Sequence, residues 1–235
     1  ELPEGSVDLP WARGRDWAAG EFARDQGALV PGHLVASAKS WLCHPGVDRT
    51  AAILPWGADE PGARKLSPVQ ASARYLQHMK EAWNHLLGGE EGCRLEEQRI
   101  LLTVPASFDE IARELTVQAA QEAGLRQIVL IEEPLAAFYA WLADHEATWR
   151  TQLGDGQVIL VCDVGGGTTD FTVVVAREGE KGLRFDRLAV GEHLMLGGDN
   201  MDIALARRVE SRLAAEAGKL DSVRWQTLVM QCRLA

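Results

Sequence analysis

Residues 163–170 read Asp-Val-Gly-Gly-Gly-Thr-Thr-Asp, a run of residue types that can bind phosphate. Three consecutive glycines let the backbone approach a ligand closely and turn successive N–H groups toward one point. Thr168 and Thr169 add hydroxyl donors. Asp163 and Asp170 would repel a bare phosphate, but they suit one that carries Mg²⁺ and could orient a water molecule for in-line attack. The run therefore favours a phosphate–metal site, with a long glycine-rich hairpin as the structural alternative.

The residues around this run support that interpretation. Apolar residues 158–162 come directly before Asp163, and ligand sites in α/β proteins usually lie at the carboxyl ends of strands. The spacing matches neither GxxxxGK followed by Ser or Thr nor GxGxxG. A P-loop and a dinucleotide-binding Rossmann fold are therefore disfavoured.

The composition limits the class of protein. The chain has 235 residues, 24 Lys+Arg against 34 Asp+Glu, a net charge of −10 and 46% hydrophobic residues. These values are close to the globular average and exclude a disordered chain. No apolar run is long enough to span a membrane, and the acidic balance argues against nonspecific nucleic-acid binding. We therefore expect neither a membrane nor a nucleic acid as a partner, whereas backbone amides can still bind phosphate.

The cysteines and tryptophans carry weaker signals. The four cysteines contain no CxxC pair, which disfavours a zinc site. We predict that Cys43 and Cys162 are small buried hydrophobic residues in a reducing compartment, and we expect a cytoplasmic location. Four of the eight tryptophans fall in the first 60 residues, and we predict that they anchor the core: Trp11, Trp17, Trp41 and Trp56.

The elements that must position the glycine-rich run follow from periodicity. Ser67-Pro68 predicts the start of a helix that ends at Gly88-Gly89. Further signals predict a strand over 100–104, a helix from Asp109 through Ala123, a strand over 128–131 and a helix over 135–149. Such alternation implies crossovers and a parallel sheet.

The flanking regions have different patterns. Before residue 67 we predict a short helix over 33–43, a strand over 51–56 and a loop over 57–66. After Gly154-Asp155-Gly156, three apolar runs joined by short turns predict an antiparallel meander, with strands over 158–162, 171–176 and 183–190. Helices are expected over 199–217 and 223–234.

Five segments, taken in chain order, resemble those of the seventy-kilodalton heat-shock chaperones of the DnaK type, which are actin-like ATPases. They are Ala38–Leu42, Thr103–Phe108 with the helix after it, Ile131–Ala137, Asp163–Asp170 and Gly197–Asp202. The order of the five matches the order in that family, which makes the resemblance specific.

The resemblance implies an α/β fold of the actin-like ATPase (ribonuclease H-like) type, present in part, as two lobes with inserted subdomains. It assigns 1–66 to an inserted subdomain of lobe one, 67–152 to the α/β core of lobe one, 153–198 to the three-stranded meander of lobe two with its phosphate loop, and 199–235 to the start of a helical insertion of lobe two. Family members carry another phosphate hairpin with an Asp-x-Gly-Thr pattern, which residues 1–37 lack. We therefore expect an internal fragment.

The resemblance also implies roles for single residues. Those that would bind nucleotide are Gly165, Gly166, Gly167, Thr168, Thr169, Gly197 and Gly198. Those that would serve catalysis are Asp163, Glu133, Lys39 and Asp170, with Asp163 acting on the metal mostly through water. Pro105 and Arg113 would belong to a switch that reports the nucleotide state. Structural alternatives remain: Glu133 as a first-turn acid favoured by the helix dipole, Lys39 as a solvated lysine and Arg113 as a surface charge.

The implied function is that of an ATPase domain fragment of a molecular chaperone, with ATP or ADP and Mg²⁺ as cofactors. Hydrolysis would be coupled to a conformational change, and client proteins and co-chaperones would bind through parts outside this chain. We expect the fragment alone to bind nucleotide weakly and to hydrolyse it negligibly. Two alternatives stay open: a sugar-kinase-like phosphotransferase and a non-catalytic actin-like interaction module.

Overall fold

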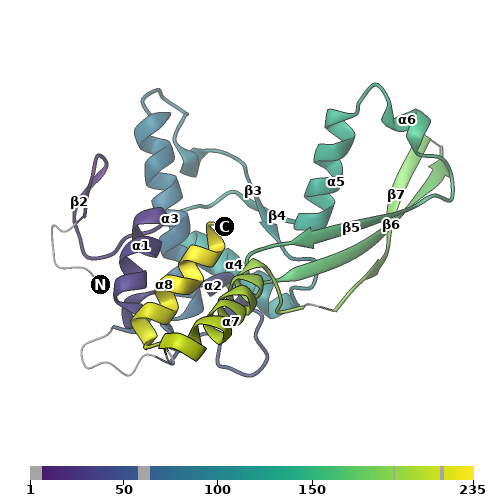
Figure 1. The fold of residues 1–235 in the computed structure, drawn as a ribbon. Helices are drawn as coiled ribbons and strands as arrows, with labels where there is room; N and C mark the ends of the chain where they lie inside the picture. The colour runs from purple at the N-terminus through teal and green to yellow at the C-terminus, as the bar shows by residue number, and fades with distance from the viewer. Residues whose placement is uncertain (1–6, 58–63, 181, 193, 218–219) are drawn as a thin grey trace.

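The structure is a computed structural model that describes residues 7–57, 64–180, 182–192, 194–217 and 220–235. Its elements, in chain order, are β1 (Val7–Leu9), β2 (Ala12–Arg15), α1 (Glu21–Leu29), η1 (Pro31–His33), α2 (Ala38–Trp41), α3 (Pro68–Leu86), η2 (Leu95–Glu97), β3 (Ile100–Val104), α4 (Glu110–Glu122), β4 (Ile128–Glu132), α5 (Glu133–Asp144), α6 (Trp149–Gln152), β5 (Val158–Val164), β6 (Thr169–Gly179), β7 (Gly182–Val190), α7 (Gly198–Ala217) and α8 (Ser222–Arg233). Figure 1 shows the strands β5–β7 projecting away from a mainly helical part. None of the helices described is long and apolar enough to cross a membrane.

The helical part is built on α3 and α4, and we call the stretch from α2 to β4 (residues 38–57 and 64–132) the helix–strand half. The Ser67 hydroxyl accepts a hydrogen bond from the Gln70 N–H, and the Gln70 side chain accepts one from the Ser67 N–H. This capping box and Pro68 at the first turn fix the start of α3. The predicted helix is confirmed.

The parallel sheet predicted from the alternating pattern is also confirmed. Strand β3 pairs with β4 in parallel, with Ile100 opposite Ile128 and Val104 opposite Glu132. Helix α4 forms the crossover between them, and the Asp109 carboxylate caps it by accepting from the Ala112 N–H. One buried cluster joins α2, α3, β3 and α4: Leu42, Val69, Ala73, Val104, Phe108, Ala112, Leu115 and Ala119.

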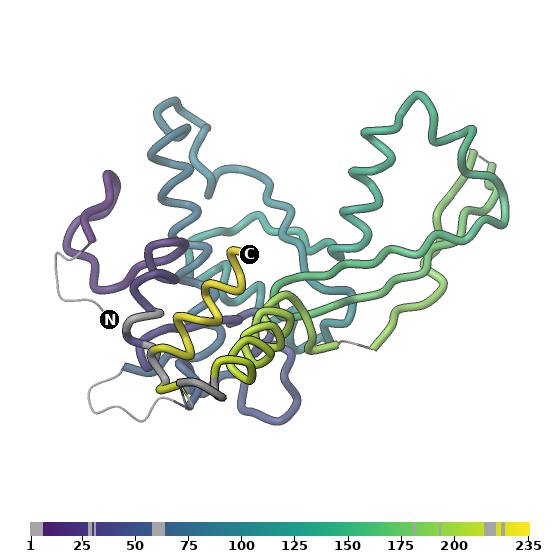
Figure 2. Tube along the Cα trace, in the orientation of Figure 1, coloured from purple at the N-terminus to yellow at the C-terminus, as the bar shows by residue number. Residues whose placement is uncertain are grey.

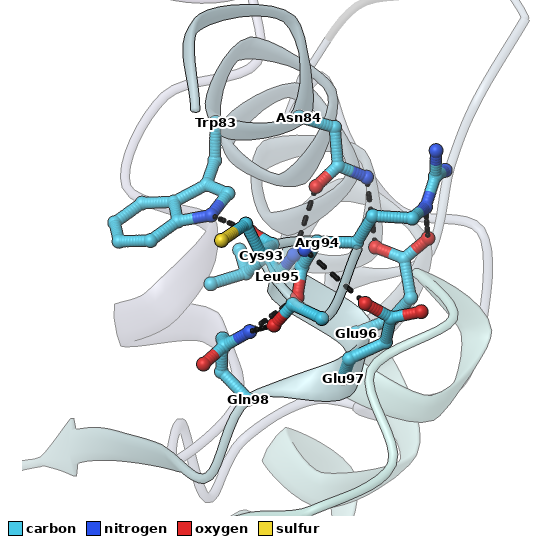
Figure 3. A network of polar contacts seen from close by, with 9 residues as sticks. Trp83, Asn84, Cys93, Arg94, Leu95, Glu96, Glu97 and Gln98 are labelled. Atoms are coloured by element: carbon cyan, nitrogen blue, oxygen red, sulfur yellow. Dashed lines mark hydrogen bonds and ion pairs between the residues drawn. The ribbon is translucent and has the colours of Figure 1, made fainter. Parts of the chain in front are cut away.

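The end of α3 is held to the loop before β3 by a network of polar contacts (Figure 3). The Asn84 side chain donates to Glu96 at 2.8 Å and accepts from the Leu95 N–H at 2.8 Å, and the Trp83 indole donates to the Cys93 carbonyl. The hydrogen bond from the Asn84 amide, together with a smaller contribution from the Arg94 guanidinium, lowers the pKa of Glu96 to about 2. This carboxylate therefore stays charged where it satisfies the loop.

Strands β5, β6 and β7 form the predicted antiparallel meander, which we call the meander (residues 158–190). Alternate residues of β6 are buried on one face: Asp170, Thr172, Val174 and Ala176. Helix α5 packs on this face, where the rings of Phe138 and Phe185 lie 4.8 Å apart. The opposite face of β5 is exposed along its length, at Val158, Leu160, Cys162 and Val164.

That uncovered face corrects the prediction for Cys162, which is exposed because its strand position points away from α5. Cys43 is half-buried, and burial raises the pKa of its thiol to about 11. All four cysteines are free thiols.

Three other sequence predictions were wrong in part. The helix predicted over 33–43 is reduced to α2, because Ser37 adopts a left-handed backbone conformation (φ 55°) that separates it from η1. The strand predicted over 51–56 is a single bridge between Leu54 and Leu66, since Pro55 has no N–H to extend a ladder. The helix predicted over 135–149 ends at Asp144, and non-helical backbone at His145 and Thr148 precedes α6.

The prediction that four N-terminal tryptophans anchor the core is confirmed only for Trp41, which is half-buried and packs against the buried cluster of Ala38, Leu54 and Ala71. Trp56 is exposed, and Trp11 and Trp17 are half-buried and belong to none of the buried apolar clusters found among the described residues. The Trp41 and Trp56 rings stack at 4.7 Å, and Arg15 lies 4.2 Å over Trp17. The loop predicted over 57–66 lies mostly outside the described residues. Helices α7 and α8 match the two predicted C-terminal helices.

Candidate functional site

The glycine-rich run forms the tip of the β5–β6 hairpin. Asp163 lies opposite Asp170 in the strand register, and the Gly165 N–H donates to the Thr168 carbonyl at 2.8 Å to close the tip. The N–H groups of Gly166, Gly167 and Thr168 form no hydrogen bond with any part of the chain that the structure describes. Three successive backbone donors are thus available for an anion at this tip, which we call the phosphate loop (residues 165–168).

Two close approaches explain why glycine occupies these positions. A Cβ atom at Gly167 would lie 3.2 Å from the Ser40 hydroxyl and 3.5 Å from the Ser37 hydroxyl. A Cβ atom at Gly197 would lie 2.6 Å from the carbonyl oxygens of both Gly165 and Gly166. A side chain at Gly197 would therefore force the backbone apart.

The start of α7 is hydrogen-bonded to the phosphate loop. The Gly198 N–H donates to the Gly165 carbonyl at 3.0 Å, and the Asp199 N–H donates to the Gly166 carbonyl at 2.7 Å. The N-terminal end of a twenty-residue helix therefore lies beside the tip and adds a positive dipole end to it. The family resemblance implies that Gly197 and Gly198 bind nucleotide, and the structure places both beside the phosphate loop.

Helix α2, which belongs to the helix–strand half, lies beside the phosphate loop. The Ser37 hydroxyl donates to the Asp199 carboxylate at 3.3 Å, and the Lys39 ammonium lies 2.5 Å from Glu133 Oε1. Glu133 is the first residue of α5, and its side chain is mostly buried whereas that of Lys39 is half-exposed. Two residues assigned separately to catalysis, 94 positions apart, thus form one ion pair.

Asp170 is held in a different way from Asp163. Its side chain is 3% exposed, and its carboxylate accepts a hydrogen bond from the Ser107 hydroxyl at 2.7 Å. Asp163 is half-buried. The Ser107 contact ties the turn after β3 to β6, so Asp170 has a clear structural role beside any catalytic one.

The two residues predicted to form a switch lie where the helix–strand half meets the meander. Pro105 is fully buried at the end of β3. The Arg113 guanidinium donates to the Phe108 carbonyl at 3.2 Å and to Glu132 at 3.0 Å. Arg187 of β7 also pairs with Glu132, so one carboxylate joins α4 to the meander. Arg113 is therefore an ion-paired residue and not a solvated surface charge.

The ionisable groups at the site do not form a metal cage. Within the described ranges there is no group of three or more His, Cys, Asp or Glu side chains placed to hold a metal ion. Asp163 is the carboxylate nearest to the phosphate loop along β5, and a single carboxylate suits a Mg²⁺ ion that keeps most of its water ligands.

Several residues of the site were missed from the sequence. Ser37 and Arg187 carry no sequence signal, and Ser40 and Ser107 lie inside recognised segments but had no role assigned to them. Each is an ordinary residue type that only folding brings to the site. The left-handed backbone of Ser37 is uncommon for a residue other than glycine, and such conformations gather at functional sites. Asp199 was part of a recognised motif, but its contact with Ser37 could not be read from it.

Comparison with known proteins identifies related chains. A family model described as "Hsp70 protein" matches residues 50–232. A "Chaperone protein HscA homolog" from Acidithiobacillus ferrooxidans is 35% identical over 213 residues, which cover 86% of this chain and 31% of the relative. A protein of the same name from Acinetobacter baylyi is 33% identical over 178 residues, which cover 76% of this chain and 26% of the relative. The chain therefore spans between about a quarter and a third of the length of these relatives.

Proposed function

The chain belongs to the Hsp70 protein family, whose domain has the actin-like ATPase fold, and we propose that it supplies the part of a chaperone ATPase domain that binds the phosphates of ATP. The observation that carries the proposal is that segments distant in the sequence meet at one place. Residues of α2, the turn after β3, the start of α5 and the start of α7 all contact the β5–β6 hairpin or each other at one place. These are the five segments that carry the family resemblance in the sequence.

In this proposal the phosphate loop binds the β- and γ-phosphates through its backbone. Gly166, Gly167 and Thr168 offer their N–H groups, and the hydroxyl of Thr168 adds a side-chain donor. The Thr169 hydroxyl donates to the Leu196 carbonyl at 2.8 Å, so Thr169 acts by holding the loop against the segment before α7. Gly197 and Gly198 keep that segment close enough for the nucleotide to contact both.

The catalytic roles fall to the charged residues around the loop. Mg²⁺, when bound, would neutralise charge that develops on the phosphates, and we assign Asp163 to its water shell. Lys39 would orient the attacking water and offset negative charge near the γ-phosphate, with Glu133 holding the ammonium in place. Asp170 would fix the hairpin through Ser107 and lie behind the reacting groups.

The connection to a substrate domain would pass through the contacts between the helix–strand half and the meander. We propose that Pro105 and Arg113 report the nucleotide state, because Arg113 shares Glu132 with Arg187 of the meander. Client proteins and co-chaperones would bind parts outside this chain. The division into 1–66, 67–152, 153–198 and 199–235 is proposed on the same basis. The four free thiols support a reducing, cytoplasmic location.

The experiment measures binding of MgADP and MgATP to the chain by titration calorimetry, with Gly167→Ala and Gly154→Ala as a matched pair. A methyl group at Gly167 would crowd the Ser40 hydroxyl, whereas one at Gly154 would meet nothing within 4 Å. We expect weak nucleotide binding that Gly167→Ala lowers by about tenfold or more and that Gly154→Ala leaves unchanged. Equal affinities for the two variants would place the nucleotide elsewhere.

Catalysis is tested in the longer protein. Asp163→Asn keeps the size of the side chain and removes its charge, so steady-state phosphate release should fall by about tenfold or more. The chain alone should turn over ATP negligibly. An Asp163→Asn protein with the wild-type rate would remove Asp163 from the mechanism, and binding without any hydrolysis in the longer protein would favour a non-catalytic module.

A further inference from the structure

Two acidic side chains lie near the start of α7, the helix end that is hydrogen-bonded to the phosphate loop. The Asp199 N–H donates to the Gly166 carbonyl at 2.7 Å, and a Cβ atom at Gly166 would lie 4.0 Å from the Asp199 carboxylate. Asp202 lies about one turn further along the same helix. The Asp199 carboxylate is therefore next to the backbone that is proposed to bind phosphate, and a negative charge at this distance repels an anion.

Asp199 also competes with phosphate for the positive end of the helix dipole. It lies in the first turn of α7, where an acidic side chain is stabilised by the dipole. A phosphate at the adjacent loop would be attracted by the same helix end. Unless another charge compensates for it, the acid that stabilises the start of the helix opposes the binding of phosphate beside it.

Arg233, in the last turn of α8, supplies such a charge. Its Nε donates to Asp202 Oδ2 at 2.9 Å, and its Nη2 donates to Asp199 Oδ1. Figure 2 shows α7 (yellow-green) and α8 (yellow) side by side, an arrangement that brings Arg233 to the start of α7. Because the guanidinium is planar and rigid, the two hydrogen bonds fix its position relative to both carboxylates.

The balance of charge at the start of α7 depends on this arginine. With Arg233 in place, the group of Asp199, Asp202 and Arg233 carries one net negative charge, and without the guanidinium it would carry two. Since Arg233 is already paired with two carboxylates, it acts on a nearby phosphate by lowering the repulsion from Asp199 and not as a free donor.

The exposure of these side chains limits the size of the effect. The Asp199 and Arg233 side chains are 37% and 41% exposed, whereas that of Asp202 is mostly buried. Interactions between partly exposed charges are weakened by solvent and are screened by salt. The influence of Arg233 on an anion at the loop should therefore be moderate and should depend on the ionic strength.

We propose that Arg233 is a positioning residue of the nucleotide site, which neutralises Asp199 beside the phosphate loop and thereby permits phosphate to bind there. The Ser37 hydroxyl donates to the other oxygen of the same carboxylate, Asp199 Oδ2, at 3.3 Å. The carboxylate is thus held between Ser37 and Arg233, with its charge offset on one side. This inference rests on the proposed function, since it assumes that the nucleotide phosphates bind at residues 165–168.

The test measures the affinity of the 235-residue chain for MgADP by titration calorimetry at low and at raised salt. Arg233→Gln should lower the affinity by about tenfold at low salt, because it leaves the Asp199 charge uncompensated, and the loss should shrink as salt is raised. Arg224→Gln is the matched control. Arg224 is an exposed arginine of α8 that pairs with Asp221, so its substitution removes the same charge from the same helix and should change the affinity by less than about twofold.

A second substitution separates neutralisation from direct contact with the phosphate. Asp199→Asn in the Arg233→Gln background restores the net charge of the group and keeps the size of the side chain, so the affinity for MgADP should return to within about threefold of the wild type. Asp199→Asn alone should bind MgADP at least as tightly as the wild type. Circular dichroism and the melting temperature check that each variant is folded, and a double-mutant cycle of the two substitutions in urea measures the coupling between the side chains.

Four results would overturn the inference. They are wild-type affinity in Arg233→Gln at low salt, a loss that salt does not change, a double variant as weak as Arg233→Gln alone, and zero coupling in the urea cycle. The third would mean that Arg233 contacts the phosphate directly or acts by holding α8 in place. If Gly167→Ala weakens MgADP binding and Arg233→Gln does not, the inference fails while the proposed function stands. If the wild-type chain binds no nucleotide, both fail.

Discussion

The helix–strand half and the meander are stabilised in different ways. The buried apolar clusters found among the described residues all lie in the helix–strand half, around Leu42, Leu54 and Ala120, and none includes a residue of the meander. The meander buries one face against α5 and leaves the opposite face of β5 exposed. The phosphate loop, which is mostly glycine, is therefore positioned by contacts from outside its own sheet.

Matched Leu→Ala substitutions give the largest expected difference between the two regions. Leu115 is 8% exposed in the core of the helix–strand half, and Leu160 is 62% exposed on β5. Leu115→Ala should lower the free energy of unfolding by about 2–4 kcal/mol, since it leaves a cavity. Leu160→Ala should lower it by less than about 1 kcal/mol, because little buried area is lost.

Urea denaturation of both variants measures these changes under the same conditions. A loss for Leu160→Ala as large as that for Leu115→Ala would mean that the exposed face of β5 is covered in solution, and the contrast between the two regions would disappear.

Removing the hydrogen bond between Ser107 of the helix–strand half and Asp170 of the meander should have the next largest effect on stability. Ser107→Ala takes a donor from the buried Asp170 carboxylate, and an acceptor left with fewer partners costs about 1–3 kcal/mol. The free energy of unfolding should fall accordingly. Ser211→Ala, an exposed serine that donates to the Arg208 carbonyl within α7, is the control and should change little. Equal effects from the two substitutions would argue against a special role for the Ser107 contact.

A double-mutant cycle of Glu132→Gln and Arg187→Gln measures the ion pair that joins α4 and β4 to the meander. Arg187 is half-exposed, so the coupling free energy should be about 0.5–1 kcal/mol and should shrink as salt is raised. Arg184→Gln tests a pair confined to β7, with Asp186, and should shift the free energy of unfolding by less than about 0.5 kcal/mol. Zero coupling at low salt would show that Glu132 does not link the two regions.

Acid should produce the smallest effect, and it should act within the helix–strand half. The pKa of Glu96 is lowered to about 2 from an ordinary value of 4.5, chiefly by the Asn84 amide. A folded-state pKa below the unfolded value adds stability above about pH 4.5 that is lost as the pH falls toward about 2. The urea midpoint should therefore fall less steeply over this range in Glu96→Gln than in the wild type.

Asn84→Ala provides the second arm of the acid experiment. It removes the main cause of the lowered pKa, so its acid dependence should also be shallower than that of the wild type. If all three proteins lost stability in parallel, the network around Glu96 would not contribute to acid stability.

The elements of the helix–strand half could be predicted because their signals are local. Ser67-Pro68 and Asp109 mark helix starts through hydrogen bonds made within one turn, and β3 and β4 are apolar runs of the expected length. The predictions that failed concerned burial by distant segments or the backbone conformation of a single residue. Nothing near Cys162 says which face of β5 is covered, and nothing near Ser37 says that its backbone is left-handed.

The candidate site likewise has features that the local sequence predicts and contacts that it does not. The residue types in 163–170 indicate phosphate binding by themselves, because glycine is needed where a backbone must approach a ligand closely, whereas 197–202 indicates it only through the family resemblance. The pairing of Lys39 with Glu133 and of Ser107 with Asp170 could not be predicted, since each pair joins residues more than sixty positions apart.

Local signals in the sequence were therefore enough to predict α3, α4, α7 and α8, the strands β3 to β7 and the family resemblance, since capping, periodicity and residue type act over a few neighbouring residues. Folding in three dimensions sets which of the charged residues meet and which face of the meander is covered. The physical reason is that pairing, burial and local potential depend on distances in space, which chain order does not set.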